Sequence, residues 1–343
     1  MKLLLTTSPG IEDIVAEEAR YKLNARIIEY RRARGRIIVD LDDENLYLVE
    51  KMRSIHHARI LLHQGKVCSS LECLRNLEEV LRSIDYHIYI TPHTTFAVRV
   101  ERVGDHEYNS MDVAKLAGRV VQEEVARRYS AKPRVDLDYP NIIIAIDIIG
   151  SEILIGVELT GEISLHRRGY RIYDHPAALK PTLAYAMLMI SGVHDGELVV
   201  DPMCGGGTIA IEAAYLLEHS PIHCNDVNKS YLKGAMMNAI AARVSSRIRF
   251  GLIDAKELHK HYNSIDIIVT NPPYGIRMGS PGRIKELYEK FVAAAARVLN
   301  KSLVIISAEH RFLKNLLTEN GLSIVHERDV AHGGLWLKII KAK

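Results

Sequence analysis

The chain has 343 residues, of which 48% are hydrophobic and 25% charged, so it is long enough for two or three domains with cores of their own. No apolar run reaches the roughly 18–20 residues that span a bilayer, and the N-terminal apolar stretch is too short for a signal peptide, which indicates a cytoplasmic protein without membrane contact. A net charge of only +3 excludes a protein that is basic overall, so any nucleic-acid surface must be a local patch.

The first 55 residues alternate strand and helix around a basic turn. The expected elements are a strand at 3–6, a helix at 11–23, a hairpin with strands at 26–30 and 36–41, and a helix at 42–52. The hairpin holds the densest basic cluster of the chain, Arg31, Arg32, Arg34 and Arg36. These arginines are candidate RNA-phosphate contacts, although a solvated turn would have the same composition.

Residues 56–162 predict a second compact α+β module with an exposed sheet face. The expected elements are strands at 60–62, 95–103, 141–149 and 152–160, and helices at 69–84 and 111–129. Cys68 and Cys73 stand five residues apart in this module, and no second pair follows at zinc spacing. We therefore predict no metal site, and we do not expect a disulfide between them.

Residues 163–180 form a connector in which basic and aromatic side chains alternate. Arg167, Arg168 and Arg171 flank Tyr170. This mixture suits contact with phosphates and bases, so the three arginines are further RNA-binding candidates. A charged linker would look the same.

The last part of the chain, 181–343, has the rhythm of a doubly wound parallel sheet with both faces covered. The expected elements are strands at 197–201, 221–226, 247–252, 265–269, 301–307, 322–328 and 335–341, and helices at 207–218, 229–242 and 283–299. Only six residues separate the last two strands, too few for a parallel crossover. The seventh strand should therefore be antiparallel.

A glycine loop follows the first of these strands, which ends at Asp201. Cys204 is interpreted as a small residue within it, and Gly205, Gly206 and Gly207 let the backbone approach a ligand closely. Thr208 opens a helix whose N–H groups can receive a carboxylate or phosphate. Because the segment lacks Gly-Lys-Ser/Thr, a nucleoside triphosphate is disfavoured, while a tight turn without any ligand stays an alternative.

Two further acids end the next two strands. Asp226 could accept hydrogen bonds from both hydroxyls of a ribose, and Asp254, followed by Ala255, could accept from the amino group of an adenine. Either aspartate alone could simply cap a helix. Acids at three successive strand ends suit S-adenosylmethionine, whose sulfonium is positive.

Asn271-Pro272-Pro273-Tyr274 follows the fourth strand and has the chemistry to hold an aromatic amine. Such an amine is a poor nucleophile because its lone pair is delocalised into the ring. The Asn271 side-chain oxygen and the Pro272 carbonyl can accept its two hydrogens and stabilise the positive charge that develops on nitrogen. Proline fixes the turn, and Tyr274 can stack on the base. These four residues are the predicted catalytic residues.

The motifs together resemble the THUMP-containing tRNA guanine-N2 methyltransferases that act on guanosine 6 of the acceptor stem. Thr6 to Glu12 resembles the start of the family's ferredoxin-like domain, and Asn141 to Gly161 with His166 to Arg171 resembles its THUMP module. The resemblance implies a Rossmann-fold methyltransferase domain at 181–343, preceded by a ferredoxin-like domain at 1–55 and a THUMP domain at 56–162. It also implies S-adenosylmethionine, a tRNA partner and no metal, and we expect a monomer.

The family pattern places the cofactor contacts on residues of the connector, the glycine loop, the strand ends and the amine motif. They are His175, Pro176, Ala177, Leu179, Asp201, Cys204, Gly205, Gly207, Thr208, Asp226, Asp254, Ala255 and Asn271. Gly206 stands where the family often has serine. The related guanosine-10 enzymes usually carry Asp at the position of Asn271, which favours position 6.

The alternatives are methylation of tRNA guanosine 10 or of ribosomal RNA, and, less favoured, an adenine-N6 or protein-glutamine methyltransferase with the same tetrapeptide. The RNA-binding character of the first half argues against the last two. A non-catalytic RNA-binding protein is disfavoured because the cofactor and amine motifs are both intact.

Overall fold

The computed structural model describes residues 1–274 and 281–343. The strands are β1 (Lys2–Thr6), β2 (Arg26–Tyr30), β3 (Arg36–Asp40), β4 (His57–Lys66), β5 (Thr95–Val103), β6 (Arg134–Val135), β7 (Ile142–Ile149), β8 (Glu152–Glu158), β9 (Val199–Asp201), β10 (Ile222–Asp226), β11 (Ile248–Leu252), β12 (Ile265–Thr270), β13 (Leu299–Ser307), β14 (Ile324–His332) and β15 (Leu335–Ala342). The α-helices are α1 (Glu12–Leu23), α2 (Cys73–Arg82), α3 (Ser110–Tyr129), α4 (Pro181–Ser191), α5 (Thr208–Leu216), α6 (Lys229–Ala241), α7 (Leu258–His261), α8 (Pro281–Ala296) and α9 (His310–Glu319). Short 3-10 helices are η1 (Asp43–Lys51), η2 (Tyr86–Ile88), η3 (Ser245–Arg247) and η4 (Ala255–Glu257).

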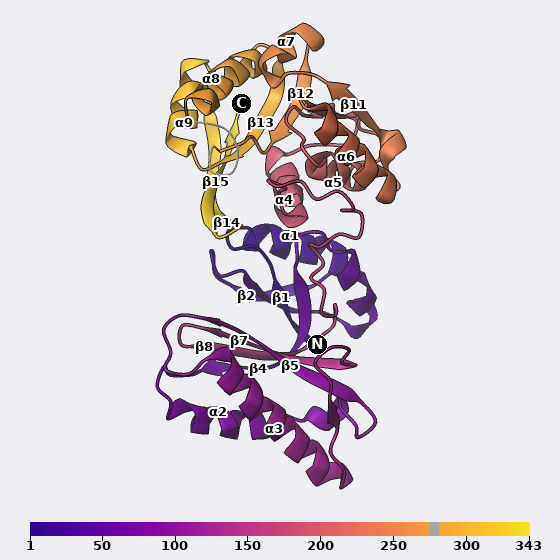
Figure 1. Ribbon diagram of the computed structural model, residues 1–343, viewed down its shortest axis with the longest axis vertical. Coiled ribbons are helices and arrows are strands. Elements are labelled where there is room, and N and C mark those ends of the chain that lie inside the picture. Colours follow the sequence, from indigo (N-terminus) through magenta and orange to yellow (C-terminus); the bar gives the residue numbers. More distant parts are fainter. Residues whose placement is uncertain (275–280) are drawn as a thin grey trace.

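The strands of the first half form one eight-stranded sheet in the order β2-β3-β1-β4-β8-β7-β5-β6. β1 pairs antiparallel with both β3 and β4, and Leu3 stands opposite Ile60. The first two predicted domains thus share a sheet. α1 covers one end of it and α2 and α3 cover the other (Figure 1), each helix burying apolar side chains against the strands. Asn109 caps α3 in a reciprocal arrangement with Asp112.

This sheet is strongly curled. β3 and β7 are four strand spacings apart, which would be about 19 Å in a flat sheet. The Arg36 Nε atom nevertheless lies 2.5 Å from the Asp147 Oδ2 atom, and Arg59 Nη1 reaches the other oxygen of Asp147 at 2.8 Å. The inner face of the curl buries Leu4 and Ile38. An ionic core therefore joins the first part of the sheet to the second.

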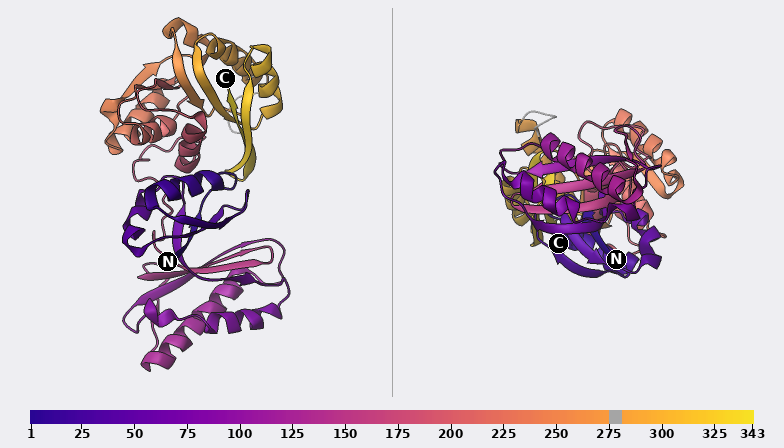
Figure 2. Two further views of the ribbon diagram at one scale, coloured as in Figure 1. Left: turned by 180° about the vertical axis from the view of Figure 1, so that it is seen from behind. Right: turned by 90° about the horizontal axis from the view of Figure 1, so that it is seen from below.

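The second half is a seven-stranded sheet in the order β11-β10-β9-β12-β13-β15-β14. β15 is antiparallel to both β13 and β14 while the remaining pairs are parallel, which confirms the predicted strand direction. α4, α5 and α6 pack on one face and α8 and α9 on the other (Figure 2). The carboxyl ends of β9, β10 and β12 meet at one edge, where ligands bind in such sheets.

Some elements differ from the expectation. α4 was not predicted because it is buried nearly all round and so has no polar face to give a helical period. α9 was also missed, and β4 runs to Lys66 rather than ending at 62. In the part of the chain that the structure describes, no helix is both long and apolar enough to cross a membrane.

Residues 1–55 lie in the middle of the molecule and are joined to the second half of the chain by two ion pairs. The Glu212 carboxylate of α5 is fully buried and accepts two hydrogen bonds from Arg53, at 2.6 and 2.8 Å. Tyr170 Oη donates to the same carboxylate at 2.8 Å. On the other side Arg328 of β14 forms a bidentate pair with Asp13 of α1, at 2.7 and 2.9 Å. These contacts fix the orientation of the two halves.

Candidate active site

The glycine loop between β9 and α5 lies against α6. Gly205 and Gly207 have φ of +51° and +78°, the left-handed region that glycine tolerates. A Cβ on Gly207 would also lie 3.0 Å from the Cβ of Ala235. The loop is tied to β10 because Cys204 N–H donates to the Asn225 carbonyl at 2.9 Å. The chain is thus held close to the strand ends, as the glycines predicted.

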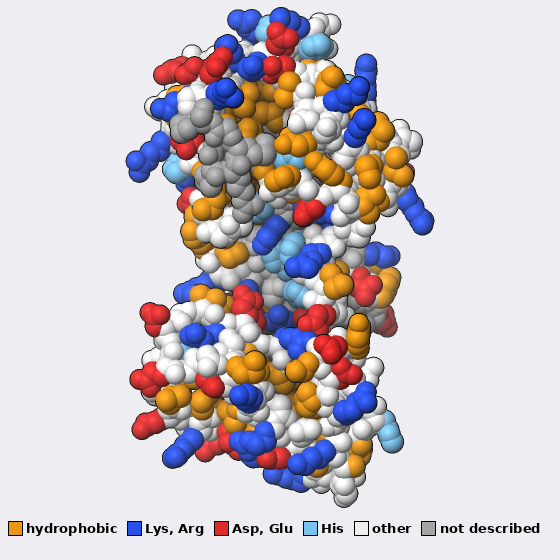
Figure 3. Space-filling view, viewed as in Figure 1, with side chains coloured by type: hydrophobic (Ala, Val, Ile, Leu, Met, Phe, Trp, Pro, Cys, Tyr) orange, Lys and Arg blue, Asp and Glu red, His pale blue; other side chains and the backbone are white. Residues whose placement is uncertain are grey.

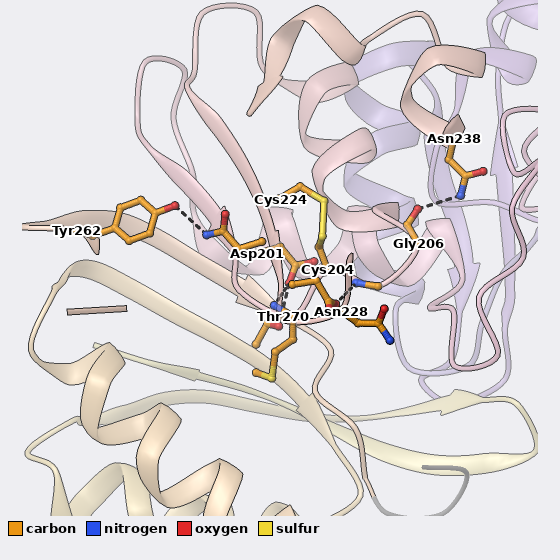
Figure 4. The surroundings of a disulfide bond; sticks show 12 residues. Asp201, Cys204, Gly206, Cys224, Asn228, Asn238, Tyr262 and Thr270 are labelled. Carbon is orange, nitrogen blue, oxygen red and sulfur yellow. Dashed lines mark hydrogen bonds between the residues drawn. A yellow bond between two sulfur atoms is a disulfide. The ribbon is translucent and has the colours of Figure 1, made fainter. Parts of the chain in front are cut away.

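A disulfide joins Cys204 of this loop to Cys224 of β10 (Figure 4), with the Cα atoms 5.5 Å apart. Cys204 is therefore a crosslink of the loop rather than a small filler. A second disulfide joins Cys68 to Cys73, with Cα atoms 5.7 Å apart, and the expectation against it was wrong. The turn from β4 into α2 brings these Cα atoms to the separation that a disulfide needs, which sequence spacing alone did not reveal.

Asp201 and Asp226 form the acidic floor of the site. Asp201 Oδ1 accepts from Thr270 Oγ1 at 2.9 Å (Figure 4) and from Met203 N–H at 3.2 Å. Asp226 accepts from Gly205 N–H at 2.9 Å. Burial raises the pKa of Asp201 to about 7, with the nearby Asp226 adding to the effect, and burial also raises the pKa of Asp226. Two buried acids at adjacent strand ends favour a cationic ligand.

Asp254 is different from the other two acids. Its side chain is 30% exposed and its Oδ1 accepts from Lys256 N–H at 2.9 Å, which makes it the N-cap of η4. One oxygen of Asp254 therefore caps η4, and the contact of its side chain with a ligand stays a prediction. Its remaining oxygen lies 3.3 Å from Lys256 Nζ, and both Asp254 and Ala255 line the cavity described below.

The connector returns over the glycine loop through His175. Its ring lies against the glycine backbone, so that a Cβ on Gly205 would come within 3.3 Å of it. His175 Nδ1 accepts from Ala177 N–H at 3.2 Å, and burial lowers its pKa, so the neutral ring carries its proton on Nε2. That buried Nε2 has no hydrogen-bond partner among the described residues. It is a donor that a ligand carboxylate would satisfy.

Asn238 of α6 is a site residue that the sequence did not reveal. Its Nδ2 donates to the Gly206 carbonyl at 2.9 Å (Figure 4). The same Nδ2 donates to the Tyr173 carbonyl at 2.9 Å, and Oδ1 accepts from Tyr173 N–H at 2.8 Å. The Tyr173 ring packs on Gly234, where a Cβ would lie 2.2 Å from the ring. A buried asparagine on the apolar face of a helix was the sequence feature that could have indicated this role. Asn238 holds the connector against the glycine loop through these hydrogen bonds.

Asn238→Ala should therefore lower the free energy of unfolding by about 2–4 kcal/mol, because it leaves buried backbone groups of Gly206 and Tyr173 unpaired. It should also weaken binding of the methyl donor about tenfold, since the loop loses its tether. Thermal unfolding and ligand titration measure the two effects. Asn315→Ala, at an exposed position of α9, is the control and should change neither. Unaltered stability in Asn238→Ala would show that these hydrogen bonds do not hold the connector to the glycine loop.

The amine motif lies opposite the acidic floor. Asn271 Nδ2 donates to the Ala177 carbonyl at 3.2 Å, and its Oδ1 accepts from the Tyr274 hydroxyl. The amide is thereby oriented with its oxygen as the acceptor. Tyr288 of α8 donates to the Pro273 carbonyl at 3.3 Å and lies 2.9 Å from Ser307 Oγ, which supports the turn from behind. The residues that follow Tyr274, 275–280, lie outside the described part.

These parts enclose a cavity of about 380 Å³, a size suited to a small-molecule ligand. All predicted cofactor and catalytic residues line it except Pro176 and Gly207. It is also lined by residues that were not predicted, among them Met203, Asn228, Tyr231, Leu287, His332, Leu335 and Leu337. The last three belong to the β14–β15 hairpin, which no motif marked.

The arginines proposed as RNA contacts lie in different surroundings. Arg36 is held by Asp147 and Glu101, and Arg168 by Glu212 and the Arg53 and Leu165 carbonyls. Arg171 pairs with Asp174 at 2.9 Å. The other four, Arg31, Arg32, Arg34 and Arg167, are exposed. Contact of any of the seven with RNA stays a prediction.

Comparison with known proteins places these observations in a family. The family model of the RMKL-like methyltransferase domain matches residues 168–338, and the THUMP domain model matches residues 74–158. The chain is 34% identical to a tRNA (guanine(6)-N2)-methyltransferase of Archaeoglobus fulgidus, covering 99% of this chain and 91% of the relative. It is 32% identical to one of Methanocaldococcus jannaschii, covering 99% of each.

The chain belongs to the tRNA (guanine(6)-N2)-methyltransferase family. The crystal structure of TrmN from Thermus thermophilus superposes with a TM-score of 0.81 at 28% identity, covering 100% of this chain and 99% of that one. S-adenosylmethionine is accordingly the cofactor of this methyltransferase. Asp201 and Asp226 fit its cationic group, and the glycine loop with His175 Nε2, which has no hydrogen-bond partner among the described residues, fits its carboxylate.

Binding of this cofactor to the methyltransferase should strengthen as pH rises through about 7. Below that pH Asp201 is neutral and gains little from a cation, whereas a bound cation favours the carboxylate, so binding releases a proton. Calorimetric titrations at pH 6 and 8, in two buffers of different ionisation enthalpy, measure the affinity and the proton release. Asp201→Asn should remove the pH dependence. An affinity that is the same at both pH values in the wild type would contradict the coupling.

Proposed function

We propose that the protein transfers the methyl group of S-adenosylmethionine to the exocyclic N2 of guanosine 6 in the acceptor stem of tRNA. The proposal is supported by the relatives named above and by one arrangement in the cavity. The oriented Asn271 amide and the following proline lie on the same cavity as Asp201 and Asp226. The cationic methyl donor can bind at the two aspartates while the aromatic amine binds beside it at Asn271 and Pro272.

In this mechanism Asn271 Oδ1 and the Pro272 carbonyl accept the two hydrogens of the guanine amine. Asn271 Oδ1 also accepts from the Tyr274 hydroxyl in the structure, and its second lone pair is left for the amine. The tyrosine ring can stack on the base. Once the amine carries the methyl group it is cationic and loses a proton readily to water, so no strong general base is needed. Most of the rate acceleration comes from positioning and from exclusion of water.

Asp226 would hold the ribose hydroxyls of the cofactor, Asp254 its adenine amino group, and the glycine loop with His175 its methionine end. The target guanosine sits in a stem, so it must be flipped out of the helix at a cost of a few kcal/mol. We further propose that the enzyme acts as a monomer in the cytoplasm, where its tRNA substrate is found.

The test is incubation with unmodified tRNA transcript and S-adenosylmethionine, followed by nuclease digestion and mass-spectrometric mapping. N2-methylguanosine at position 6 is the expected product. Methylation at position 10, or of ribosomal RNA only, would keep the chemistry and change the substrate. A methylated adenine or glutamine would overturn the proposal.

A further inference from the structure

A group of basic side chains lies at the waist of the molecule, between the methyltransferase half and the curled sheet. His56 precedes β4, His166 belongs to the connector, and Lys180 is the N-cap of α4. We call these three residues the waist cluster. The ring centroids of the two histidines are 4.6 Å apart. Figure 3 shows Lys, Arg and His side chains gathered at this level of the molecule.

Hydroxyl groups surround the two rings. Ser8 Oγ and Thr182 Oγ1 lie 3.3 and 3.4 Å from His56 Nε2. Ser164 Oγ lies 2.5 Å from His166 Nδ1. Thr182 is in the first turn of α4, where N–H groups carry the positive end of the helix dipole. Ser164 Oγ also donates to the His56 carbonyl at 3.2 Å, and Ser8 and Thr182 are fully buried. The hydroxyls therefore hold the two rings, and the Lys180 ammonium is the charged donor that the waist cluster offers to an anion.

The acidic side chains near the waist cluster are already engaged. Glu158 is held by Arg59, at 3.0 Å, and by His57, at 3.3 Å. Glu101 pairs with Arg36 at 2.7 Å. In the described part of the chain Lys180 has no ion-pair partner within 4 Å.

Among the described residues, the waist cluster thus holds one ammonium, that of Lys180, beside two imidazoles that are neutral near pH 7, and the nearby acids pair with other cations. Burial lowers the pKa of His56 to about 2 and of His166 to about 4, and the positive charges of Lys180, Arg167 and Arg171 lower the pKa of His166 further. Burial lowers the pKa of Lys180 as well, while the negative charge of Glu101, which pairs with Arg36, opposes that shift. An anion placed among these groups would stabilise their charged forms.

The waist cluster adjoins the active site along the chain. Lys180 directly follows Leu179, which lines the cavity. Two residues earlier, the Ala177 carbonyl accepts the hydrogen bond from Asn271. A nucleotide whose base enters the cavity must leave its phosphates outside, and the segment 177–180 leads from the base-binding asparagine to the waist cluster.

We propose that the waist cluster binds an RNA phosphate next to the flipped target nucleotide, with Lys180 as its charged contact. The inference rests on the proposed function, because it requires that the base held at Asn271 belongs to RNA. The site holds the RNA backbone and does not read sequence. Such a contact would help to keep the target base out of its stem, because the RNA backbone next to that base is held by the protein at the same time.

Lys180→Gln should weaken RNA binding about tenfold, as expected for loss of one charged hydrogen bond, and raise KM while leaving the affinity for S-adenosylmethionine unchanged. The slope of log Kd against log salt concentration should fall by about one, the signature of one lost phosphate contact. Lys180→Arg should restore both. Lys260→Gln is the matched control, on α7 at the end of the molecule far from the waist (Figure 1), and should leave the slope unchanged. A wild-type slope in Lys180→Gln would overturn the proposal.

The position of the phosphate is tested with a tRNA that carries one uncharged methylphosphonate beside guanosine 6. This tRNA should bind the wild type about tenfold more weakly than the all-phosphate tRNA, and should bind Lys180→Gln no more weakly. Equal losses in both proteins would place Lys180 elsewhere on the RNA and overturn the proposal. If the mapping experiment finds another methylated nucleotide, the methylphosphonate is moved beside it, so that failure of the proposed substrate and failure of the waist cluster give different results.

Discussion

Asn271→Ala is expected to lower kcat by about 10²–10³-fold, the usual effect of removing one group that stabilises charge in the transition state. The amide oxygen is lost while Asp201, Asp226 and the glycine loop are untouched, so the affinity for S-adenosylmethionine should stay within a few-fold of wild type. The loss should appear in kcat rather than in KM, because the interaction strengthens as charge develops on the amine. Single-turnover methylation with saturating tRNA measures it.

Two variants of the same motif serve as controls for Asn271→Ala. Tyr274→Phe keeps the ring and removes the hydroxyl that donates to Asn271, so its kcat should stay within a few-fold of wild type. Asn271→Asp keeps an acceptor but loses the bond from Nδ2 to the Ala177 carbonyl, so its activity should be intermediate. Full activity in Asn271→Ala would remove this residue from the mechanism.

Arg53→Ala should lower the free energy of unfolding by about 3–5 kcal/mol, because it leaves the fully buried Glu212 carboxylate without its bidentate partner. The same change removes a guanidinium stacked 4.1 Å from the centre of the Tyr215 ring. Chemical denaturation followed by circular dichroism measures the loss. A double-mutant cycle with Glu212→Gln isolates the pair, and the double variant should be more stable than the sum of the single losses predicts.

The control for the buried pair is an exposed one. Arg20 and Glu17 form an ion pair on α1 with side chains 52% and 68% exposed, and Arg20→Ala should cost less than about 1 kcal/mol. A loss of that small size in Arg53→Ala would show that the interface between the two halves is held by apolar packing instead.

The sequence predicted the elements that carry a periodic pattern or a sharp turn. The seven strands of the methyltransferase sheet and its antiparallel final strand are confirmed because their apolar runs and the short last connection leave little choice. Helix α4 was not predicted, because it is buried on nearly every side and its sequence therefore lacks the amphipathic pattern of a surface helix. The curl of the first sheet was not predicted either, because Arg36 and Asp147 are far apart in sequence and meet only in the folded chain.

The candidate site was predictable where chemistry is local in sequence. The glycine loop, Asp201, Asp226 and the amine motif line one cavity, as their places at successive strand ends indicated. Asn238 and the β14–β15 hairpin were not predictable, because their roles depend on contacts made across the fold. The arginines proposed as RNA contacts were the least predictable residues. A guanidinium that meets a carboxylate inside the protein, as Arg168 does, has the same sequence signature as one that awaits a phosphate.

The pairing of β1 with β4 has a consequence for fragments of this protein. A piece that begins at residue 56, the predicted start of the THUMP domain, would lose β1 and uncover residues 57–60 of β4, which pair with it, so that the whole strand His57–Lys66 would be unpaired on that side. Unpaired edges of that length recruit other strands, so such a fragment should self-associate or aggregate. A fragment that retains β1 and β3 keeps residues 57–60 of β4 paired and is the better choice for studying RNA binding apart from catalysis.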